Sequence, residues 1–181
     1  MLKALFRRRI EVFGRAWQYD TSYMQEILEA SLTAARRFAA VTRFAHHRED
    51  VPRAAAVAAG LATLVQEDCG PCTQLVVRMA EAEGVDPAVL RAVLVRDLTA
   101  MGEEAALGFR FAEATLAHAP EADSLREEIV RRWGTRALVS LAFAIAGARI
   151  FPTVKYAVGH GQACTRVRVG AAELPVLRRA A

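Results

Sequence analysis

The sequence predicts an all-α fold, a helical bundle of about seven or eight helices in a chain of 181 residues. Apolar residues recur three and four positions apart along most of the chain, which is the spacing of helices with one buried face. Alanine is abundant, whereas only 11 glycines and 6 prolines occur, and this composition favours helices. Strand character is confined to the short segment Thr165–Val169.

The N-terminal part is expected to form two helices. The segment Leu2–Trp17 has the pattern of a short amphipathic helix. A helix start signal follows at Asp20–Ser22, and Gln25 completes a capping-box pattern with Ser22. The second helix is therefore predicted to begin at Ser22 and to end near His46.

The middle of the chain carries two helices joined by a Cys-Gly-Pro-Cys turn. Pro52 opens the first of them, which covers Ala54–Val65 and stops around Glu67. The second helix, Thr73–Glu83, ends at Gly84 because glycine readily adopts the left-handed conformation that closes a helix. Further start and break signals predict, in chain order, helices Ala88–Arg96, Thr99–Leu116 and Pro120–Trp133, a break at Gly134–Thr135, helix Arg136–Phe151 and a loose tail Gly170–Ala181.

The charge pattern indicates which classes of binding partner are to be expected. The net charge is +4, and the arginines are scattered apart from the triplet Arg7–Arg9. We interpret this triplet as a solvated basic arm, with contact to anionic lipid or nucleic acid as the alternative. Aromatic residues do not alternate with basic ones as they do on nucleic-acid-binding surfaces, so no nucleic-acid partner is expected.

The cysteine count and the apolar runs predict a cytoplasmic protein. Three cysteines do not make the disulfide framework of a small secreted protein. Arginines interrupt the apolar residues of the N-terminus, so no signal peptide is expected. The longest apolar run, Ala137–Ala148, is shorter than the roughly 20 residues that cross a bilayer, so no membrane span is expected.

The tetrapeptide Cys69-Gly70-Pro71-Cys72 is the motif in the chain that most clearly indicates a chemical activity. Its thiols lie about one helical turn apart, so they can close a disulfide, open it again or share a metal ion. Pro71 suits the first turn of a helix, and Asp68 or Cys69 can serve as its cap. The positive end of the helix dipole favours the thiolate, which is the nucleophilic form. We interpret the motif as a redox pair in which Cys69, nearer the helix end, is the more exposed thiol.

Other interpretations of the motif and its neighbours stay open. Glu67 and Asp68 are read either as a helix end and a cap, or as carboxylates that oppose thiolate formation. Of these, Glu67 is the candidate that accepts a proton during thiol attack. Gln74 is interpreted as a solvated surface amide. The cysteines can also be two small buried hydrophobic residues, or part of a zinc set formed by Cys69, Cys72, His160 and Cys164.

A helix, a C-x-x-C turn and a second helix in an all-α chain resemble the carboxymuconolactone decarboxylase family, in its alkyl hydroperoxidase D-like branch. The matching stretch is Arg53–Val93, and a looser likeness covers roughly Pro52–Gly161. The resemblance implies a helical domain of that kind over residues 51–165, preceded by an added helical arm over 1–50 and followed by a C-terminal tail over 166–181. It also implies assembly as a homotrimer or a larger ring.

The resemblance further implies roles for the two cysteines. In that branch the second cysteine attacks the peroxide and the first one resolves the product, which assigns attack to Cys72 and resolution to Cys69. The family's redox members carry a glutamate twelve residues before the first cysteine and a histidine four residues after the second. Val57 and Val76 occupy these positions here, so Glu67 is the substitute proton acceptor that we consider.

The sequence therefore predicts a thiol-dependent oxidoreductase that reduces hydroperoxides or exchanges disulfides with a protein. It is expected to need an external thiol reductant and no organic cofactor or metal. Hydrophobic residues make up 54% of the chain, more than a single core readily encloses, so a homo-oligomer is expected. The alternative is a non-enzymatic helical oligomer whose cysteine pair is structural or holds a metal. The ring-opening decarboxylation that names the family is disfavoured, because the sequence offers no histidine-rich pocket.

Overall fold

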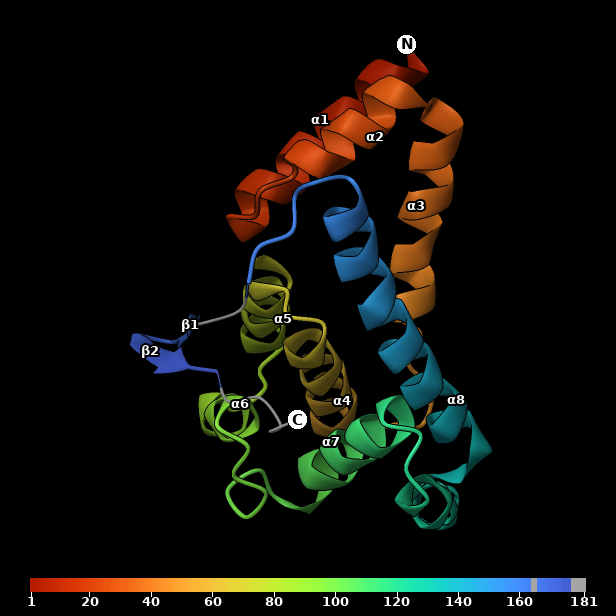
Figure 1. The fold of residues 1–181 in the computed structure, drawn as a ribbon, viewed down its shortest axis with the longest axis vertical. Helices are drawn as coiled ribbons and strands as arrows, with labels where there is room; N and C mark the ends of the chain where they lie inside the picture. The colour runs from red at the N-terminus through yellow and green to blue at the C-terminus, as the bar shows by residue number, and fades with distance from the viewer. Residues whose placement is uncertain (164–165, 177–181) are drawn as a thin grey trace.

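The computed structural model describes residues 1–163 and 166–176, which form eight α-helices and one small β-hairpin (Figure 1). The helices α1 and α2 lie side by side at one end of the molecule, and we call these two helices the arm from here on. The helix α3 runs from this arm along α8. The helices α4 to α7 and the first part of α8 form the body at the other end. The elements are α1 (Leu2–Trp17), α2 (Ser22–Ala30), α3 (Leu32–Ala45), α4 (Arg53–Gln66), α5 (Gly70–Ala82), α6 (Pro87–Leu94), α7 (Glu103–Leu116), α8 (Glu121–Ala157), β1 (Arg166–Val169) and β2 (Ala172–Pro175).

The N-terminal region differs from the prediction at one point, because the second expected helix is divided into α2 and α3. Ser31 has an extended backbone with φ −161° and ψ 116°, and its Oγ accepts a hydrogen bond from the backbone N–H of Ala34 at 3.2 Å. A serine that caps a new helix in this way ends the preceding one. The predicted capping box at Ser22 is also wrong, since the backbone N–H of Ser22 donates instead to the Asp20 carboxylate at 2.9 Å.

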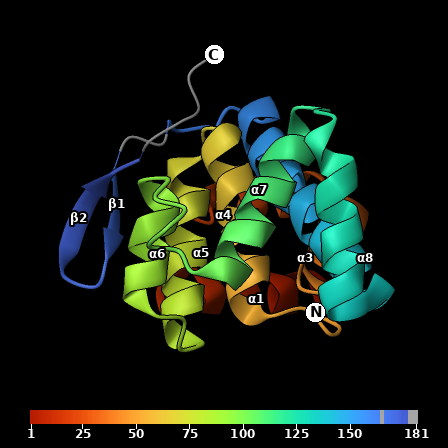
Figure 2. The same cartoon turned by 90° about the horizontal axis from the view of Figure 1, so that it is seen from below.

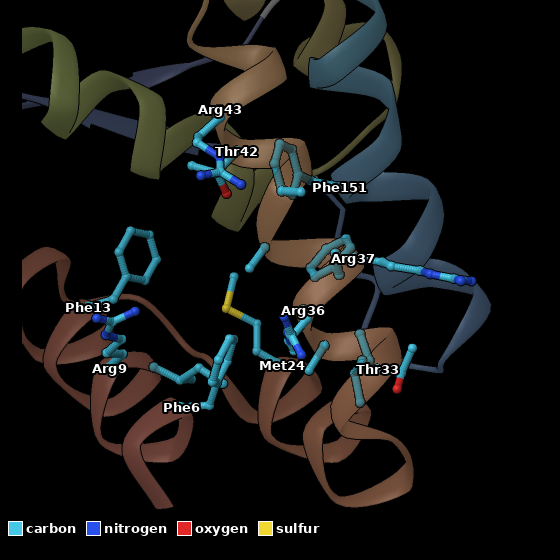
Figure 3. A pocket seen from close by; sticks show the side chains of 16 residues that line it. Phe6, Arg9, Phe13, Met24, Thr33, Arg36, Arg37, Thr42, Arg43 and Phe151 are labelled. Atoms are coloured by element: carbon cyan, nitrogen blue, oxygen red, sulfur yellow. The ribbon is translucent and has the colours of Figure 1, made fainter. Parts of the chain in front are cut away.

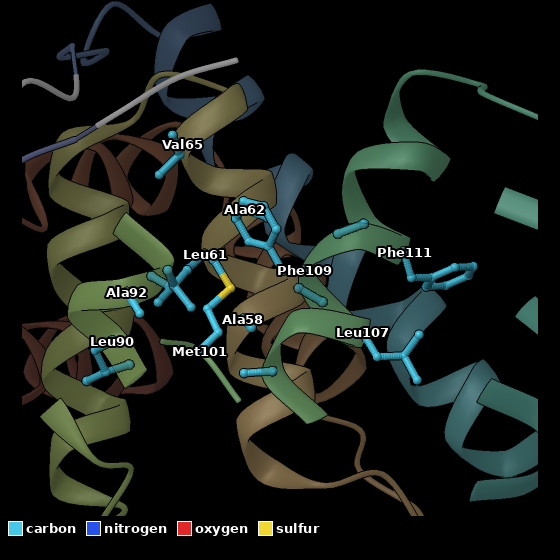
Figure 4. Close-up of a cluster of buried hydrophobic side chains, with 14 of the residues drawn as sticks. Ala58, Leu61, Ala62, Val65, Leu90, Ala92, Met101, Leu107, Phe109 and Phe111 are labelled. Atoms are coloured by element: carbon cyan, nitrogen blue, oxygen red, sulfur yellow. The ribbon is translucent and has the colours of Figure 1, made fainter. Parts of the chain in front are cut away.

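The core surrounds α4, whose buried face consists largely of alanine. Figure 4 shows Ala58 and Leu61 of this helix beside Met101 and Phe109, and Phe109 belongs to α7. The small side chains let α7 approach the α4 backbone closely. A methyl group on Gly108 of α7 would lie 2.8 Å from the Cα of Ala55, so only glycine fits at this crossing. The helix α7 begins at Glu103 and not at the predicted Thr99, because Gly102 has a positive φ of 73°.

The longest helix, α8, contains the predicted break at Gly134, where φ is 85° and ψ is 173°. Beyond this kink it continues past Pro152 to Ala157, so the proline does not end it as expected. Among the described helices, α8 is long and apolar enough to cross a membrane by length and composition. It packs against α3, α4 and α7, as a core helix of a globular protein would.

The fold is mostly helical and not all-α as predicted, because the C-terminal segment forms a β-hairpin. The expected strand begins at Arg166, and Thr165 lies outside the described residues. The expected loose tail is wrong over Ala172–Pro175, which pairs antiparallel with β1. Val167 and Val169 of β1 are buried in the core, which fixes the hairpin in place. Figure 2 shows the hairpin beside α5 and α6, on the side away from α8.

Candidate functional site

The Cys-Gly-Pro-Cys segment forms the start of α5, as the sequence predicts. Cys69 is the N-cap residue, Pro71 lies in the first turn, and the two cysteines form a disulfide with their Cα atoms 5.3 Å apart. The backbone N–H of Gly70 donates to the carbonyl of Gln162 at 3.1 Å, so the segment after α8 lies against this turn. The two thiols are therefore held within bonding distance by the helix start itself.

The two cysteines differ in their surroundings, because only one of them lines a cavity. Cys69 has an exposed fraction of 0% and Cys72 of 4%, and both pack with Leu64 in a small cluster. Cys72, but not Cys69, is among the described residues that line a cavity of about 1250 Å³ between the arm and the body. The expectation that Cys69 is the more exposed thiol is therefore wrong, because the residue at the cap position points into the protein. A small molecule in the cavity would meet Cys72 first.

Glu67 ends α4 two residues before the pair, where its carboxylate is engaged by Arg149 of α8. The Glu67 Oε1 atom lies 2.7 Å from the Arg149 Nε atom. Glu67 is not among the described residues that line the cavity with Cys72. Asp68 has a left-handed backbone with φ 55°, and its carbonyl accepts a hydrogen bond from the Tyr156 hydroxyl at 2.8 Å. Both carboxylate residues thus belong to the connection that fixes α5 to α8.

Gln74 joins α5 to the hairpin rather than facing solvent as expected. Its Nε2 donates to the carbonyl of Arg168 at 2.9 Å, and its Oε1 accepts from the Arg168 N–H at 2.8 Å. This pair of bonds satisfies a backbone N–H and C=O on the strand β1. Gln74 is therefore a structural residue of the helix that carries the cysteines.

Val57 and Val76, which stand where the resemblance would place two relay residues, face the same cavity with apolar side chains. Val57 and Val76 both line it, and Val76 also packs against the cluster of Leu64, Cys69 and Cys72. Neither side chain can exchange a proton. Proton transfer at Cys72 therefore does not pass through either of these two side chains.

Tyr19 lies next to Cys72, and Tyr23 and Lys155 lie beside Tyr19. The Tyr19 hydroxyl is 3.9 Å from the Cys72 sulfur, within the range of a weak hydrogen bond to sulfur, and 3.5 Å from the Tyr23 hydroxyl. The ammonium group of Lys155 lies over both rings, 4.9 Å from the centre of Tyr19 and 5.2 Å from that of Tyr23. Such a cation over aromatic faces is a favourable contact in a buried place.

Burial determines the protonation of these three groups. Desolvation raises the pKa of Tyr19 and that of Tyr23, so both phenols stay protonated near neutral pH. Desolvation lowers the pKa of Lys155, while the nearby Asp20 carboxylate acts in the opposite direction. The pKa of Asp20 is lowered chiefly by the hydrogen bond from the Ser22 backbone. The site therefore offers Tyr19 as a proton donor beside Cys72.

His160 does not complete a metal site in the described part of the chain. Its Nδ1 atom lies 3.1 Å from the Ser22 hydroxyl, and its Nε2 atom lies 2.8 Å from a carboxylate oxygen of Glu26. Both ring nitrogens are thus engaged by the arm. Within residues 1–163 and 166–176, no group of three or more His, Cys, Asp or Glu side chains could hold a metal ion. Cys164, the other member of the considered zinc set, lies outside the described residues.

Comparisons with protein-family models, with curated proteins and with solved structures give no significant match to this chain. The likeness to the alkyl hydroperoxidase D-like branch therefore stays a prediction from the sequence.

Sequence reasoning missed Tyr19, Tyr23 and Lys155 as residues of the site. One signal for the lysine was present, since Lys155 interrupts an otherwise apolar stretch near the end of α8. The tyrosines are spaced four residues apart around the start of α2, among residues with the pattern of a helix cap. The approach of Tyr19 to Cys72, 53 residues later, depends on how the arm folds back.

Proposed function

We propose that the protein is a thiol-dependent oxidoreductase that cycles Cys69 and Cys72 between dithiol and disulfide. The observation that carries the proposal is the pairing of the two cysteines as a disulfide with Cys72 on the wall of a cavity. The resemblance to the alkyl hydroperoxidase D-like branch supports the same chemistry. Substrates are hydroperoxides or a protein disulfide, and an external thiol is the reductant.

The reaction with a hydroperoxide begins on reduced protein. The Cys72 thiolate attacks the terminal oxygen of the hydroperoxide, the O–O bond breaks, and sulfenic acid forms on Cys72 while an alcohol leaves. The Cys69 thiolate then attacks the Cys72 sulfur, the S–S bond forms, and the oxygen leaves as water after taking a proton. Two electrons and two protons from the external thiol restore the dithiol.

The leaving oxygen of each step needs a proton, and Tyr19 is placed to give it. Its hydroxyl is close to the Cys72 sulfur and its raised pKa keeps it protonated. The phenolate formed by this transfer would lie under the Lys155 ammonium. Glu67 remains the other candidate for proton exchange, from the opposite side of the pair and in contact with Arg149.

The alternative function is a non-enzymatic helical oligomer in which the disulfide serves only stability. The observation that favours it is the burial of Cys69 within a turn that is bonded to Gln162 and to Tyr156. In this case the pair would resist reduction and reoxidation under mild conditions. A disulfide that opens and closes under those conditions argues for the redox function.

The decisive experiment follows peroxide consumption by the reduced protein with a small dithiol as reductant. Wild-type protein is expected to turn over and to show a two-proton mass loss in a peptide that contains both cysteines. Cys72→Ser should abolish turnover, whereas Cys69→Ser should leave one sulfenic acid per chain, trapped by dimedone on Cys72. A protein that consumes no peroxide and forms no disulfide with an added protein substrate would refute the proposal.

A further inference from the structure

A second hollow lies beside the cavity of Cys72, between the arm helices α1 and α2 and the helix α3. It has a volume of about 810 Å³ and is lined mainly by apolar side chains (Figure 3). Those from the arm and from α8 include Phe6, Ile10, Phe13, Met24 and Phe151. We call it the arm groove. Volumes of about 300–1000 Å³ with apolar walls are typical of sites for small organic ligands.

The arm groove carries positive charge without any matching negative charge. Arg9, Arg36, Arg37 and Arg43 line it, and none of its described lining residues is acidic. Within the described part of the chain, no ion pair is formed by these four arginines, whereas Arg7, two residues before Arg9, pairs with Glu29. Figure 3 shows Arg9 of α1 and Arg36 of α3 reaching in from opposite walls, with Met24 and Phe6 between them. Such a groove complements a ligand that is apolar along its length and anionic at one end.

The arm groove and the cysteine cavity are adjacent and share part of their walls. Phe13, Met24, Thr42 and Phe151 line both of them. A chain-like ligand with its anionic end at the arginines can therefore extend past these residues toward Cys72. The walls next to Cys72 include the apolar residues Leu64, Val76 and Ala148, whereas charged residues such as Arg48 and Glu83 line other parts of this cavity.

We infer that the arm groove binds the carboxylate end of a long-chain fatty acid, whose hydrocarbon chain runs into the cavity of Cys72. This inference rests on the proposed function, and it specifies long-chain fatty acid hydroperoxides as the substrate class. The hydroperoxide is reduced to the hydroxy acid, its O–O bond breaks, and the terminal oxygen passes to the Cys72 sulfur, as in the first step above. The arginines hold the carboxylate and the apolar walls hold the chain, so binding does not require the redox step.

Binding is tested on the full-length protein with hexadecanoate and, for comparison, with hexadecanol, by displacement of a fluorescent fatty acid. Hexadecanoate is expected to bind at least ~5-fold more tightly than hexadecanol, because only the acid gains the arginine contacts. The double variant Arg9→Gln and Arg36→Gln should weaken hexadecanoate by a similar factor and leave hexadecanol unchanged. The matched control, Arg8→Gln and Arg110→Gln, removes two exposed arginines outside the groove and should change neither affinity.

The path to Cys72 is tested by alkylation of reduced protein. An ω-bromo long-chain fatty acid should form a thioether with Cys72, with loss of bromide, at least ~10-fold faster than bromoacetate does. Excess hexadecanoate should suppress this labelling.

Equal affinity for acid and alcohol, loss of affinity in the control variant, or no binding because a second copy of the chain fills the groove would each overturn the inference. Slow labelling of Cys72 by the bromo acid would do so too. Binding and labelling without peroxide turnover would refute the proposed function alone, whereas turnover of hydrogen peroxide without fatty acid binding would refute this inference alone.

Discussion

The hydroxyl of Tyr19 lies 3.9 Å from the sulfur of Cys72, although the two residues are 53 positions apart in the chain. Tyr19 stands in the short connection between α1 and α2, so the arm brings it to the start of α5. Arg78 of α5 holds this connection in place by donating to the carbonyls of Trp17 and Gln18, each at 2.6 Å. The arm is thus part of the site and not an appendage to the body.

The first prediction concerns the proton donor. Tyr19→Phe keeps the ring over which Lys155 lies but removes the hydroxyl beside Cys72, so the rate of peroxide reduction should fall by about 10–100-fold at neutral pH. The comparison is Glu67→Gln, which removes the other candidate while keeping its shape. A fall of at least ~10-fold in the Glu67 variant together with a normal rate in the Tyr19 variant would reverse the assignment. Stopped-flow measurement of the sulfenic acid step distinguishes the two.

Much of the helical framework could be predicted because local signals determine it. The start of α4 after Pro52 and the break at Gly134 follow from the backbone preferences of single residues. The division at Ser31 was missed because the apolar spacing continues through it. A serine there has two options of similar free energy, a helical turn or a cap, and tertiary packing decides between them.

The cysteine pair could be predicted from its spacing, but its surroundings could not. Disulfide closure needs only the i,i+3 geometry at one helix start, which is local. The proximity of Tyr19 and Lys155 to Cys72 depends on how three distant segments pack. The burial of Cys69 is likewise a tertiary property, since its cap position alone would leave it exposed.

The second prediction concerns the crossing of α4 and α7. Gly108→Ala should lower the free energy of unfolding by about 1–3 kcal/mol, because the new methyl group meets the backbone of Ala55. Gly60→Ala is the matched control within α4, where the added methyl group meets no described atom within 4 Å. Its expected effect is a gain of about 0.5–1 kcal/mol from helix propensity. Urea unfolding followed by circular dichroism measures both, and equal effects of the two variants would contradict the close approach.

The third prediction concerns Lys155, which is buried with a lowered pKa. Between this lowered value and the ordinary value of about 10.4, the unfolded chain binds more protons than the folded one, so Lys155 makes stability rise with pH in that window. Below it, the cost of burying the charge is fully present. Lys155→Met should therefore raise the unfolding temperature at pH 7, by about 2–4 °C for each kcal/mol gained.

The pH dependence provides the check on this prediction. The gain in the Lys155→Met variant should shrink as the pH rises through about 10.4, because the wild-type lysine is already neutral in the folded state and then loses its proton in the unfolded state as well. Lys3→Met is the control, since Lys3 is exposed and pairs with Glu29 at 2.7 Å. Its effect on the unfolding temperature at pH 7 should be small. A variant that is less stable than wild type at pH 7 would show that the contacts with the two tyrosine rings outweigh the cost of burial.

The last prediction is that the protein forms a homo-oligomer through the second part of α8. Val139 lies within its apolar run and is 40% exposed, and Ala142 and Ala146, about one and two turns further along the same face of this helix, are exposed as well. Light scattering at micromolar concentration should give a mass of at least twice 19.7 kDa. Val139→Glu should reduce this mass to that of one chain, because a charge in the contact would lose its hydration. Val12→Glu introduces the same charge on the exposed face of α1 and should leave the mass unchanged. A wild-type protein that is monomeric throughout this range would refute the oligomer, and with it the assembly that the family resemblance implies.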